Sequence, residues 1–299
     1  MISEQIVRVL WIGSHFFHCA HYASLLCRDG LLFRVTLPSP LQAGNSVTVS
    51  MDTVFSHTIE AHPAKIGQND KQLVRFVANV YHFSPYPTTT QTTTFVLPTA
   101  SPESYTRVKP VTAQDTNIVY GPYSSVAPLS SKSVTLHYEN NGPFMTVLSL
   151  DRLIEVSHWG NIAVEEAVLV YHSGAELKGA FSRYDFQRMP QSGQAAVRSY
   201  KTLLPASAQD VYYRDEIGNI STSHLREEED AVEMELRPRF PLFGGWQTKY
   251  TLGYNVPSYE YLYHRGKQFQ LKMRFVDHIF DEQVIDEITV RVILPEGSK

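Results

Sequence analysis

Apolar and polar residues alternate along much of this chain with a period of two rather than the 3.6 of a helix. Residues 231–237 are the clearest case, because Val232, Met234 and Leu236 share one face and two glutamates occupy the other. Helical periodicity is nearly absent, and residues 257–262 are the best helical candidate, about one turn long. The alternation also predicts strands at residues 31–37, 46–55, 72–81, 88–97, 133–138, 144–148, 152–157, 163–171, 194–204, 249–254, 269–275 and 288–294.

Breaks between these strands predict the domain organisation. Residues 99–131 are rich in Pro, Ser and Thr, so we expect a long connection there rather than regular structure. The Asn-Asn-Gly-Pro run before Phe144 is a strong break, and we place the domain boundary at it. The sequence therefore predicts an all-β protein with two tandem antiparallel β-sandwich domains. Residues 1–30 form an atypical N-terminal segment, residues 31–141 a first and incomplete domain, and residues 142–299 the second domain.

Residues 209–224 contain the strongest hairpin signal. β-Branched and aromatic residues flank Gly218-Asn219, a dipeptide typical of a two-residue turn between strands. Asn219-Ile220-Ser221 is also an acceptor sequon for an N-linked glycan, which requires a surface position in a protein of the secretory pathway. We therefore expect Asn219 to be glycosylated.

Composition and charge exclude several classes of protein. Hydrophobic residues make up 43% of the 299 residues, which is typical of a globular chain with a core. A formal net charge of −4 argues against nucleic acid as a partner. No run of about 18 apolar residues is present, so no segment reads as a membrane-spanning helix. Two cysteines, Cys19 and Cys27, cannot form a disulfide framework; a single bridge stays open, and the redox compartment is undecided.

The N-terminal segment holds the only residues that resemble a metal site. His15, His18, His21 and Cys27 are zinc-ligand types, but their spacing fits no standard zinc motif. An irregular terminus is the favoured interpretation, and the segment is also a poor signal peptide. We expect no metal and no cofactor.

Candidate catalytic residues are also better explained structurally. Glu165-Glu166 and Asp281-Glu282 are paired acids, yet adjacent residues on a strand point to opposite faces and cannot flank one sugar. Ser157 and His158 are likewise neighbours, and the sequence has no nucleophile elbow around them. No catalytic residue is therefore predicted.

Residues 237–246 combine Arg, Pro, Gly and aromatics in a dense strip. Aromatic and Arg side chains are enriched at binding hot spots, although such residues also fill the cores of sandwiches. The strip is our candidate partner interface, with Arg237, Arg239, Phe240, Phe243 and Trp246 as the candidate contact residues.

Several collinear runs resemble the ribophorin I family. The similarity extends from about residue 31 to residue 299 and rests on rare aromatic combinations. The matching runs are residues 84–88, 103–106, 134–141, 154–166, 177–179, 181–185, 209–224, 237–246, 257–263, 273–278 and 280–286.

The resemblance implies a function and a location. Members are non-catalytic subunits of oligosaccharyltransferase, the complex of the endoplasmic reticulum membrane that moves a preassembled glycan from dolichyl diphosphate to Asn in Asn-x-Ser/Thr sequons. They carry two lumenal β domains, one transmembrane helix and a cytosolic helical region. The chain is thus expected to be a lumenal scaffold glycoprotein that contacts the catalytic subunit and other subunits.

Departures from the family pattern lead to a further expectation. Neither the signal peptide nor the transmembrane helix is recognisable, so we expect a truncated form whose membrane association depends on regions absent here. Two alternatives stay open: an independent extracellular β-sandwich binding module, or a carbohydrate-active enzyme that depends on Glu165 or Glu166.

Overall fold

A computed structural model of the chain describes residues 9–10, 25–27, 30–32, 40–188, 195–281 and 283–298. The described residues from His57 onward form one compact unit, and those before it belong to another. In the latter, β1 (Val9–Leu10) pairs antiparallel with β4 (Ser50–Met51), and β2 (Leu25–Cys27) with β3 (Gly30–Leu32). The strand predicted at residues 31–37 lies mostly outside the described residues, and the one predicted at residues 46–55 is reduced to β4.

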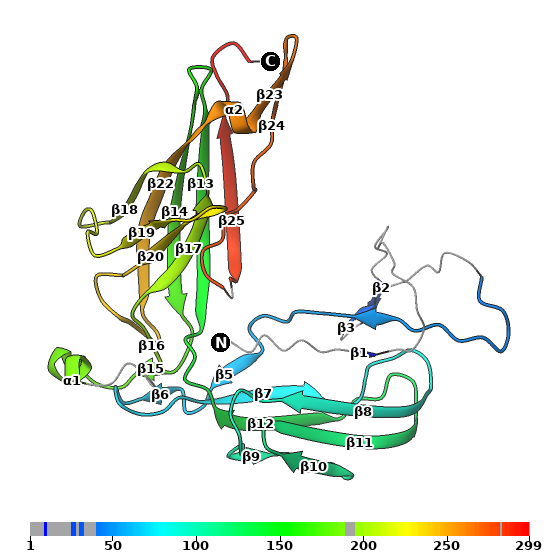
Figure 1. The fold of residues 1–299 in the computed structure, drawn as a ribbon. Helices are drawn as coiled ribbons and strands as arrows, with labels where there is room; N and C mark the ends of the chain where they lie inside the picture. Colours follow the sequence, from blue (N-terminus) through cyan, green and yellow to red (C-terminus); the bar gives the residue numbers. More distant parts are fainter. Residues whose placement is uncertain are drawn as a thin grey trace. The chain divides into compact units, whose positions relative to one another are not determined.

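Two sheets follow from residue 59 to residue 139 (Figure 1). One has the order β5-β7-β12-β9 and the other β10-β11-β8, and all their pairings are antiparallel. Buried side chains of both sheets, among them Phe76, Phe95, Tyr120 and Leu136, form a single hydrophobic cluster, which makes this part a β-sandwich. The strands are β5 (Ile59–Ala61), β6 (Lys65–Ile66), β7 (Leu73–Asn79), β8 (Thr88–Val96), β9 (Ser104–Tyr105), β10 (Val111–Gln114), β11 (Asn117–Val126) and β12 (Ser133–Glu139).

A second sandwich follows from residue 145. Its five-stranded sheet has the order β18-β22-β14-β13-β25, and its three-stranded sheet the order β17-β20-β19. The pairing of β13 with β25 is parallel, an exception to the antiparallel arrangement predicted. The elements are β13 (Met145–Val156), β14 (Asn161–His172), β15 (Glu176–Leu177), α1 (Arg183–Arg188), β16 (Ala196–Val197), β17 (Tyr200–Pro205), β18 (Gln209–Asp215), β19 (His224–Glu227), β20 (Ala231–Leu236), β21 (Leu242–Phe243), β22 (Gln247–Pro257), α2 (Ser258–Tyr261), β23 (Leu262–Arg265), β24 (Gln268–Leu271) and β25 (Ile285–Ile293).

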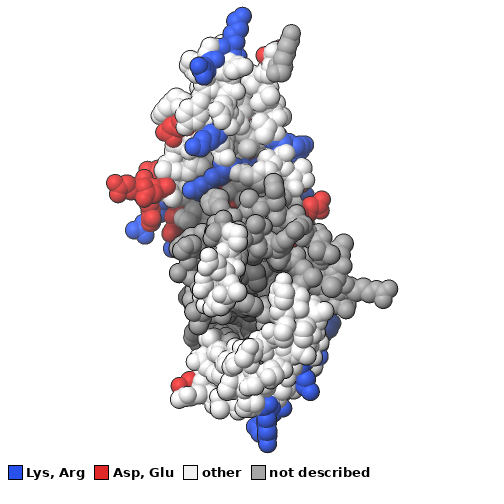
Figure 2. Space-filling model, turned by 90° about the vertical axis from the view of Figure 1, so that its right-hand side faces the viewer, with Lys and Arg blue, Asp and Glu red and all other residues white. Residues whose placement is uncertain are grey.

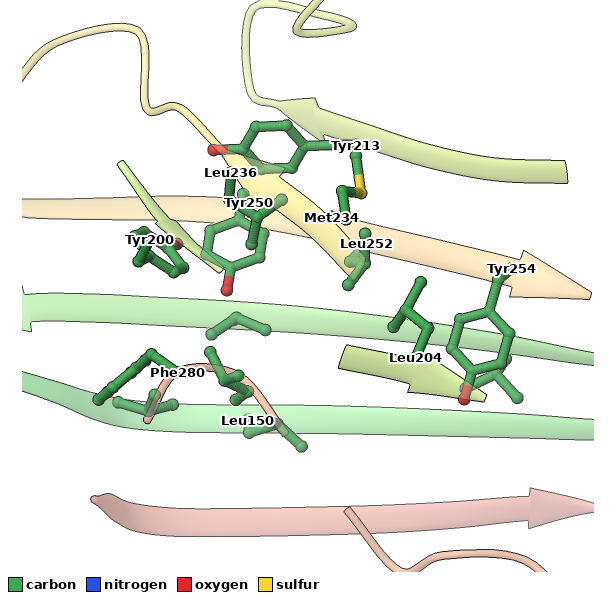
Figure 3. Packing of buried hydrophobic residues seen from close by; sticks show 14 of the residues in the cluster. Leu150, Tyr200, Leu204, Tyr213, Met234, Leu236, Tyr250, Leu252, Tyr254 and Phe280 are labelled. Atoms are coloured by element: carbon green, nitrogen blue, oxygen red, sulfur yellow. The ribbon is translucent and has the colours of Figure 1, made fainter. Parts of the chain in front are cut away.

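The core of the second sandwich is rich in tyrosine (Figure 3). Tyr213 of β18 and Tyr250 of β22 meet edge to face, with ring centroids 5.2 Å apart, and Leu236 of β20 lies beside them. Leu204 of β17 packs near Tyr254 in the same cluster. Side chains of both sheets therefore interdigitate in one core, as the two inner faces of a sandwich do.

The all-β prediction is confirmed, and the clearest alternation is confirmed with it. Val232, Met234 and Leu236 are buried, whereas Glu233 and Glu235 lie at the partly exposed face of β20. The helices of the described residues are the short α1 and α2, and α2 lies where residues 257–262 were expected to be helical.

The expected connection at residues 99–131 is wrong, because β9, β10 and β11 occupy it. Ile118 and Tyr120 are buried on one face of β11, and the register shifts between Tyr120 and Tyr123 at a bulge. A Cβ on Gly121 would lie 2.7 Å from the carbonyl oxygen of Gln91, so the Gly-Pro pair fits into the bulged strand rather than ending it.

The two strands predicted at residues 144–148 and 152–157 are one strand, β13. Its pairing with β14 shifts between Val147 and Ser149, which accommodates the polar residues without a turn. Arg152 continues the strand because its cross-strand neighbour is Glu166. The strand predicted at residues 269–275 ends earlier, at Leu271 of β24, and α1 was not predicted.

Candidate functional site

The sequon turn lies two residues earlier in the chain than the Gly218-Asn219 turn that the sequence predicts. Asp215 donates its backbone N–H to the carbonyl of Gly218 (3.0 Å), and Asn219 forms an isolated bridge with Arg214. The carboxylate Oδ1 of Asp215 accepts the backbone N–H groups of Ile217 and Gly218, both at 3.0 Å. This Asx arrangement fixes the turn at residues 215–218 and leaves Asn219 on the returning strand.

The predicted second strand of that hairpin is short. Ile220 donates its N–H to the carbonyl of Tyr213 (2.9 Å), after which the chain leaves β18. His224–Glu227 forms β19, which pairs with β20 in the other sheet. Asn219 and Ser221 are exposed, so the acceptor amide and the hydroxyl of the sequon both lie at the surface.

Asp215 also joins the sequon turn to the Arg-rich strip. Arg239 donates Nε to Oδ2 of Asp215 (2.7 Å) and Nη2 to Oδ1 (2.9 Å), a bidentate pair. The hydrogen bond from Arg239, helped by the N–H groups of Gly218 and Ile217, lowers the pKa of Asp215 to about 2. Two segments that are separate in sequence are therefore one surface held by an ionised carboxylate.

The other residues of the strip divide between surface and core. Arg237 forms an ion pair with its strand neighbour Glu235 (Nε–Oε1 3.1 Å) and stays exposed. Phe240 is 61% exposed, so the described part of the chain leaves most of this apolar side chain uncovered. Phe243 is buried, and Trp246 is half-buried.

Phe243 and Trp246 belong to an aromatic cluster that the sequence did not predict. Their rings lie 5.5 Å apart, and Phe181 lies 5.6 Å from Phe243 and 5.9 Å from Trp246. Phe186 of α1 completes the set at 5.8 Å from Phe243, with the guanidinium of Arg198 4.0 Å above its ring. The cluster fixes α1 beside the strip, and Phe243 supports the exposed residues from beneath.

Asp215 is the residue of this site that sequence reasoning missed. An Asp three residues before a Gly is a known turn signal, because its carboxylate accepts backbone N–H groups ahead of it. Nothing in the local pattern indicates its second partner, Arg239, which is 24 residues away.

The paired acids Glu165 and Glu166 have opposite environments. Glu165 accepts hydrogen bonds from the hydroxyl of Tyr212 and from Nη2 of Arg214 (3.0 Å) at the surface of the sheet. Glu166 points into the core and is 1% exposed. The two carboxylates therefore do not face a common cavity, as adjacent strand positions predict.

Glu166 is part of a buried polar network. Nη1 of Arg152 donates to Oε1 of Glu166 and to Oδ2 of Asp277 (2.7 Å), and Nη2 donates to the hydroxyl of Tyr254 (3.1 Å). Burial raises the pKa of Glu166 to about 7, although the Arg152 charge opposes this shift. The network joins the central strands β13, β14 and β22 to the segment before β25, which is a structural role.

The remaining candidates from the sequence are placed as follows. Ser157 Oγ accepts the backbone N–H of Trp159 (3.0 Å), and the ring of His158 packs 5.0 Å from that of Phe269. Asp281 is exposed, with Oδ1 3.4 Å from Nε2 of His278. Glu282, His15, His18, Cys19 and His21 and the side chain of Cys27 lie outside the described residues.

The described segments contain neither a cluster of metal-ligand residues nor a membrane-spanning helix. Within them, no group of three or more His, Cys, Asp or Glu side chains is arranged to hold a metal ion. The helices described there are all too short to cross a bilayer.

Fold and site together define an all-β protein with an exposed sequon beside an Arg-rich surface. Comparison with known proteins gives the family: the Ribophorin I model matches residues 25–299, and the chain belongs to this family.

Three relatives illustrate the match. The chain is 46% identical over 275 residues to "Dolichyl-diphosphooligosaccharide--protein glycosyltransferase subunit 1" of Caenorhabditis elegans, covering 91% of this chain and 47% of that protein. It is 40% identical to subunit 1A of Arabidopsis thaliana (90% of this chain, 44% of the relative) and 38% identical to subunit 1B of Oryza sativa subsp. japonica (89% and 57%). The chain therefore spans about half the length of these relatives.

Proposed function

We propose that this chain is a non-catalytic subunit of the dolichyl-diphosphooligosaccharide–protein glycosyltransferase complex and supports the N-glycosylation of proteins. Family membership across residues 25–299 is the observation that carries the proposal, because relatives at 38–46% identity are named as subunit 1 of that enzyme. The partners are then the catalytic subunit and the other subunits of the complex, at the lumenal side of the endoplasmic reticulum membrane.

The environments of the candidate acids support a non-catalytic role. Glycosidases need two carboxyl groups facing one sugar about 5–9.5 Å apart. Here Glu166 is enclosed by Arg152, Tyr254 and Asp277, and Glu165 is engaged by Tyr212 and Arg214. Glu166 is buried away from any substrate and Glu165 is engaged by Tyr212 and Arg214, which supports a contribution of binding surface rather than chemistry.

The Arg-rich strip is the proposed contact surface for a partner subunit. Arg237, Arg239 and Phe240 are exposed, and Trp246 is partly accessible, which matches the residue types found at hot spots. Asp215 holds Arg239 in a fixed rotamer, so a partner need not meet the full entropic cost of ordering that side chain. Phe243 acts as the buried support of this surface.

Domain organisation supports a scaffold role. The first hydrophobic cluster ends at Phe144 and the second begins at Met145, which agrees with two β domains divided near residue 141. Contacts join them: β6 pairs with β15, and Gln72 Oε1 accepts the backbone N–H of Ala175 (2.9 Å). We propose residues 31–141 and 142–299 as these domains.

Affinity purification tests the proposal. An epitope-tagged chain, targeted to the endoplasmic reticulum, should co-purify with the catalytic subunit from solubilised microsomes. Arg239→Glu with Phe240→Ser should lower the recovered catalytic subunit by at least about tenfold, since hot-spot residues contribute about 2 kcal/mol or more each. Tyr86→Ser is the matched control, because Tyr86 is a comparably exposed aromatic on the first sandwich.

The outcomes separate the candidates. A folded chain that recovers no subunit of the complex would contradict the proposal and favour an independent binding module. Glycosidase or transferase activity of the purified chain that is lost in Glu165→Gln or Glu166→Gln would instead show a carbohydrate-active enzyme.

A further inference from the structure

One end of the second sandwich carries an exposed aromatic surface. The β13–β14 turn, α2 and the β23–β24 hairpin meet there (Figure 1). Trp159 in the turn is 97% exposed, Tyr259 of α2 is 79% exposed, and Tyr263 and Phe269 of the hairpin are more than half exposed. Large apolar side chains are unfavourable in water, so four together mark a contact surface. These four residues define the aromatic tip.

The aromatic tip is a continuous structure rather than four separate side chains. The ring of His158 packs 5.0 Å from that of Phe269, which joins the β13–β14 turn to the hairpin. Ser258 donates its backbone N–H to the carbonyl of Gly160 (3.0 Å), which joins the same turn to α2. The elements therefore hold the four aromatic residues at one end in a defined arrangement.

Charge at this end is opposite in sign to that of the whole chain. Residues 258–276, from α2 onward, contain four basic residues and one acidic residue, Glu260 of α2, although the formal net charge of the chain is −4. Arg265, Lys267 and Lys272 are exposed, and within the described part of the chain none of the three forms an ion pair. Figure 2 shows Lys and Arg side chains gathered at the top end, where Figure 1 places the hairpin.

We propose that the aromatic tip docks on the surface of a phospholipid bilayer. Trp and Tyr favour the interface between headgroups and acyl chains, where an aromatic body and a polar edge are both accommodated. Lys and Arg beside them are attracted to lipid phosphates and to anionic headgroups. An exposed Trp and Phe with adjacent cations and few acids is a combination that favours binding to a bilayer surface. The proposal is independent of the glycosyltransferase assignment.

Vesicle flotation with the full 299-residue chain tests this docking. The chain should float with phosphatidylcholine vesicles, and more strongly when the vesicles also contain phosphatidylserine. Trp159→Ser should lower the partition coefficient by at least about tenfold on both, since burial of a large apolar side chain contributes about 1.5–3 kcal/mol. Arg265→Gln with Lys267→Gln should reduce binding by about fivefold per charge on the anionic vesicles, and much less on the neutral ones.

A matched control and a direct probe make the test specific. Tyr86→Ser removes an aromatic that is 67% exposed on the first sandwich, and should leave flotation unchanged. Brominated phosphatidylcholine should quench tryptophan fluorescence of the wild type, and Trp159→Phe should lose that quenching although Trp11 and Trp246 remain.

Several results would overturn the proposal. In one, the folded wild type floats with neither kind of vesicle. In another, Trp159→Ser floats as well as the wild type. Cross-links from the aromatic tip to a protein subunit alone, with no quenching by lipid, would show a protein partner instead.

Discussion

Replacement of Arg152 by Met should destabilise the second sandwich more than any surface substitution. The Arg152 side chain is 1% exposed and lies between the carboxylates of Glu166 and Asp277. Met keeps most of the aliphatic volume but removes the charge and every hydrogen bond to the acids and to Tyr254. The energetic effect therefore comes from carboxylates left buried without a cation.

The expected size of this effect depends on pH. Removal of one partner from a buried ion pair costs about 3–5 kcal/mol, because the remaining charge cannot regain its solvation. Glu166, whose pKa burial raises to about 7, can avoid that cost by binding a proton, which is easier at low pH. We therefore expect a loss of about 3–5 kcal/mol at pH 8 and a smaller loss near pH 5.

Urea unfolding of wild type and Arg152→Met, followed by near-ultraviolet circular dichroism at both pH values, measures this loss. Arg226→Met is the matched control, because Arg226 forms an exposed ion pair with Glu228 (Nε–Oε1 3.5 Å). The control should change the free energy of unfolding by less than about 1 kcal/mol. If Arg152→Met is as mild as the control at pH 8, the buried network does not hold the sheet together and the reasoning is refuted.

Glu166, Asn219, Asp215 and Gly244 each have a contact or position that a single substitution tests. Because burial raises the folded-state pKa of Glu166 to about 7 from an ordinary 4.5, the wild type should lose up to about 3 kcal/mol of stability as pH rises through that interval. Glu166→Gln should abolish this contribution. If the change in urea midpoint between pH 4.5 and 7.5 is the same for Glu166→Gln as for the wild type, the prediction is wrong. Asn219→Gln should remove one glycan from a chain expressed in the secretory pathway, measured as a shift in intact mass; an identical mass would show that the sequon is unused. Asp215→Ala should cost about 1–2 kcal/mol in thermal unfolding, since the turn and Arg239 lose their acceptor at a partly exposed site. Gly244→Ala should lower the free energy of unfolding by at least about 1–3 kcal/mol, because the new Cβ would lie 1.9 Å from the carbonyl oxygen of Ala175 and the backbone must shift. If the variant unfolds in urea at the same midpoint as the wild type, Gly244 is not packed this closely.

Sequence alternation predicts the strands whose two faces meet different environments. β20 is the example: its apolar residues face the core and its glutamates face solvent, so the period of two is visible without other information. The same argument separates Glu165 from Glu166 correctly, because neighbouring strand residues point to opposite sides of a sheet.

Strands with buried polar residues or bulges were predicted less well. Arg152 is a polar residue inside β13 that is stabilised by partners on β14, β22 and the segment before β25. Its local pattern therefore resembles a bend, and only tertiary pairing makes it a strand position. Residues 117–126 were missed for a related reason, because the Gly-Pro pair reads as a turn until a bulge accommodates it.

The candidate site can be described only from local sequence motifs and tertiary contacts together. The sequon and the Arg-rich strip are each visible in the sequence, yet their connection through Asp215 and Arg239 depends on a non-local pair of side chains. Once the two are joined, a partner that contacts Arg239 or Phe240 must approach beside Asn219. A glycan there is bulky and hydrated, so it would limit the directions of approach and protect the edge of the strip from unrelated proteins. Loss of Asp215 would therefore affect both features, since one carboxylate orders the turn that presents Asn219 and the guanidinium of Arg239 in the proposed contact surface.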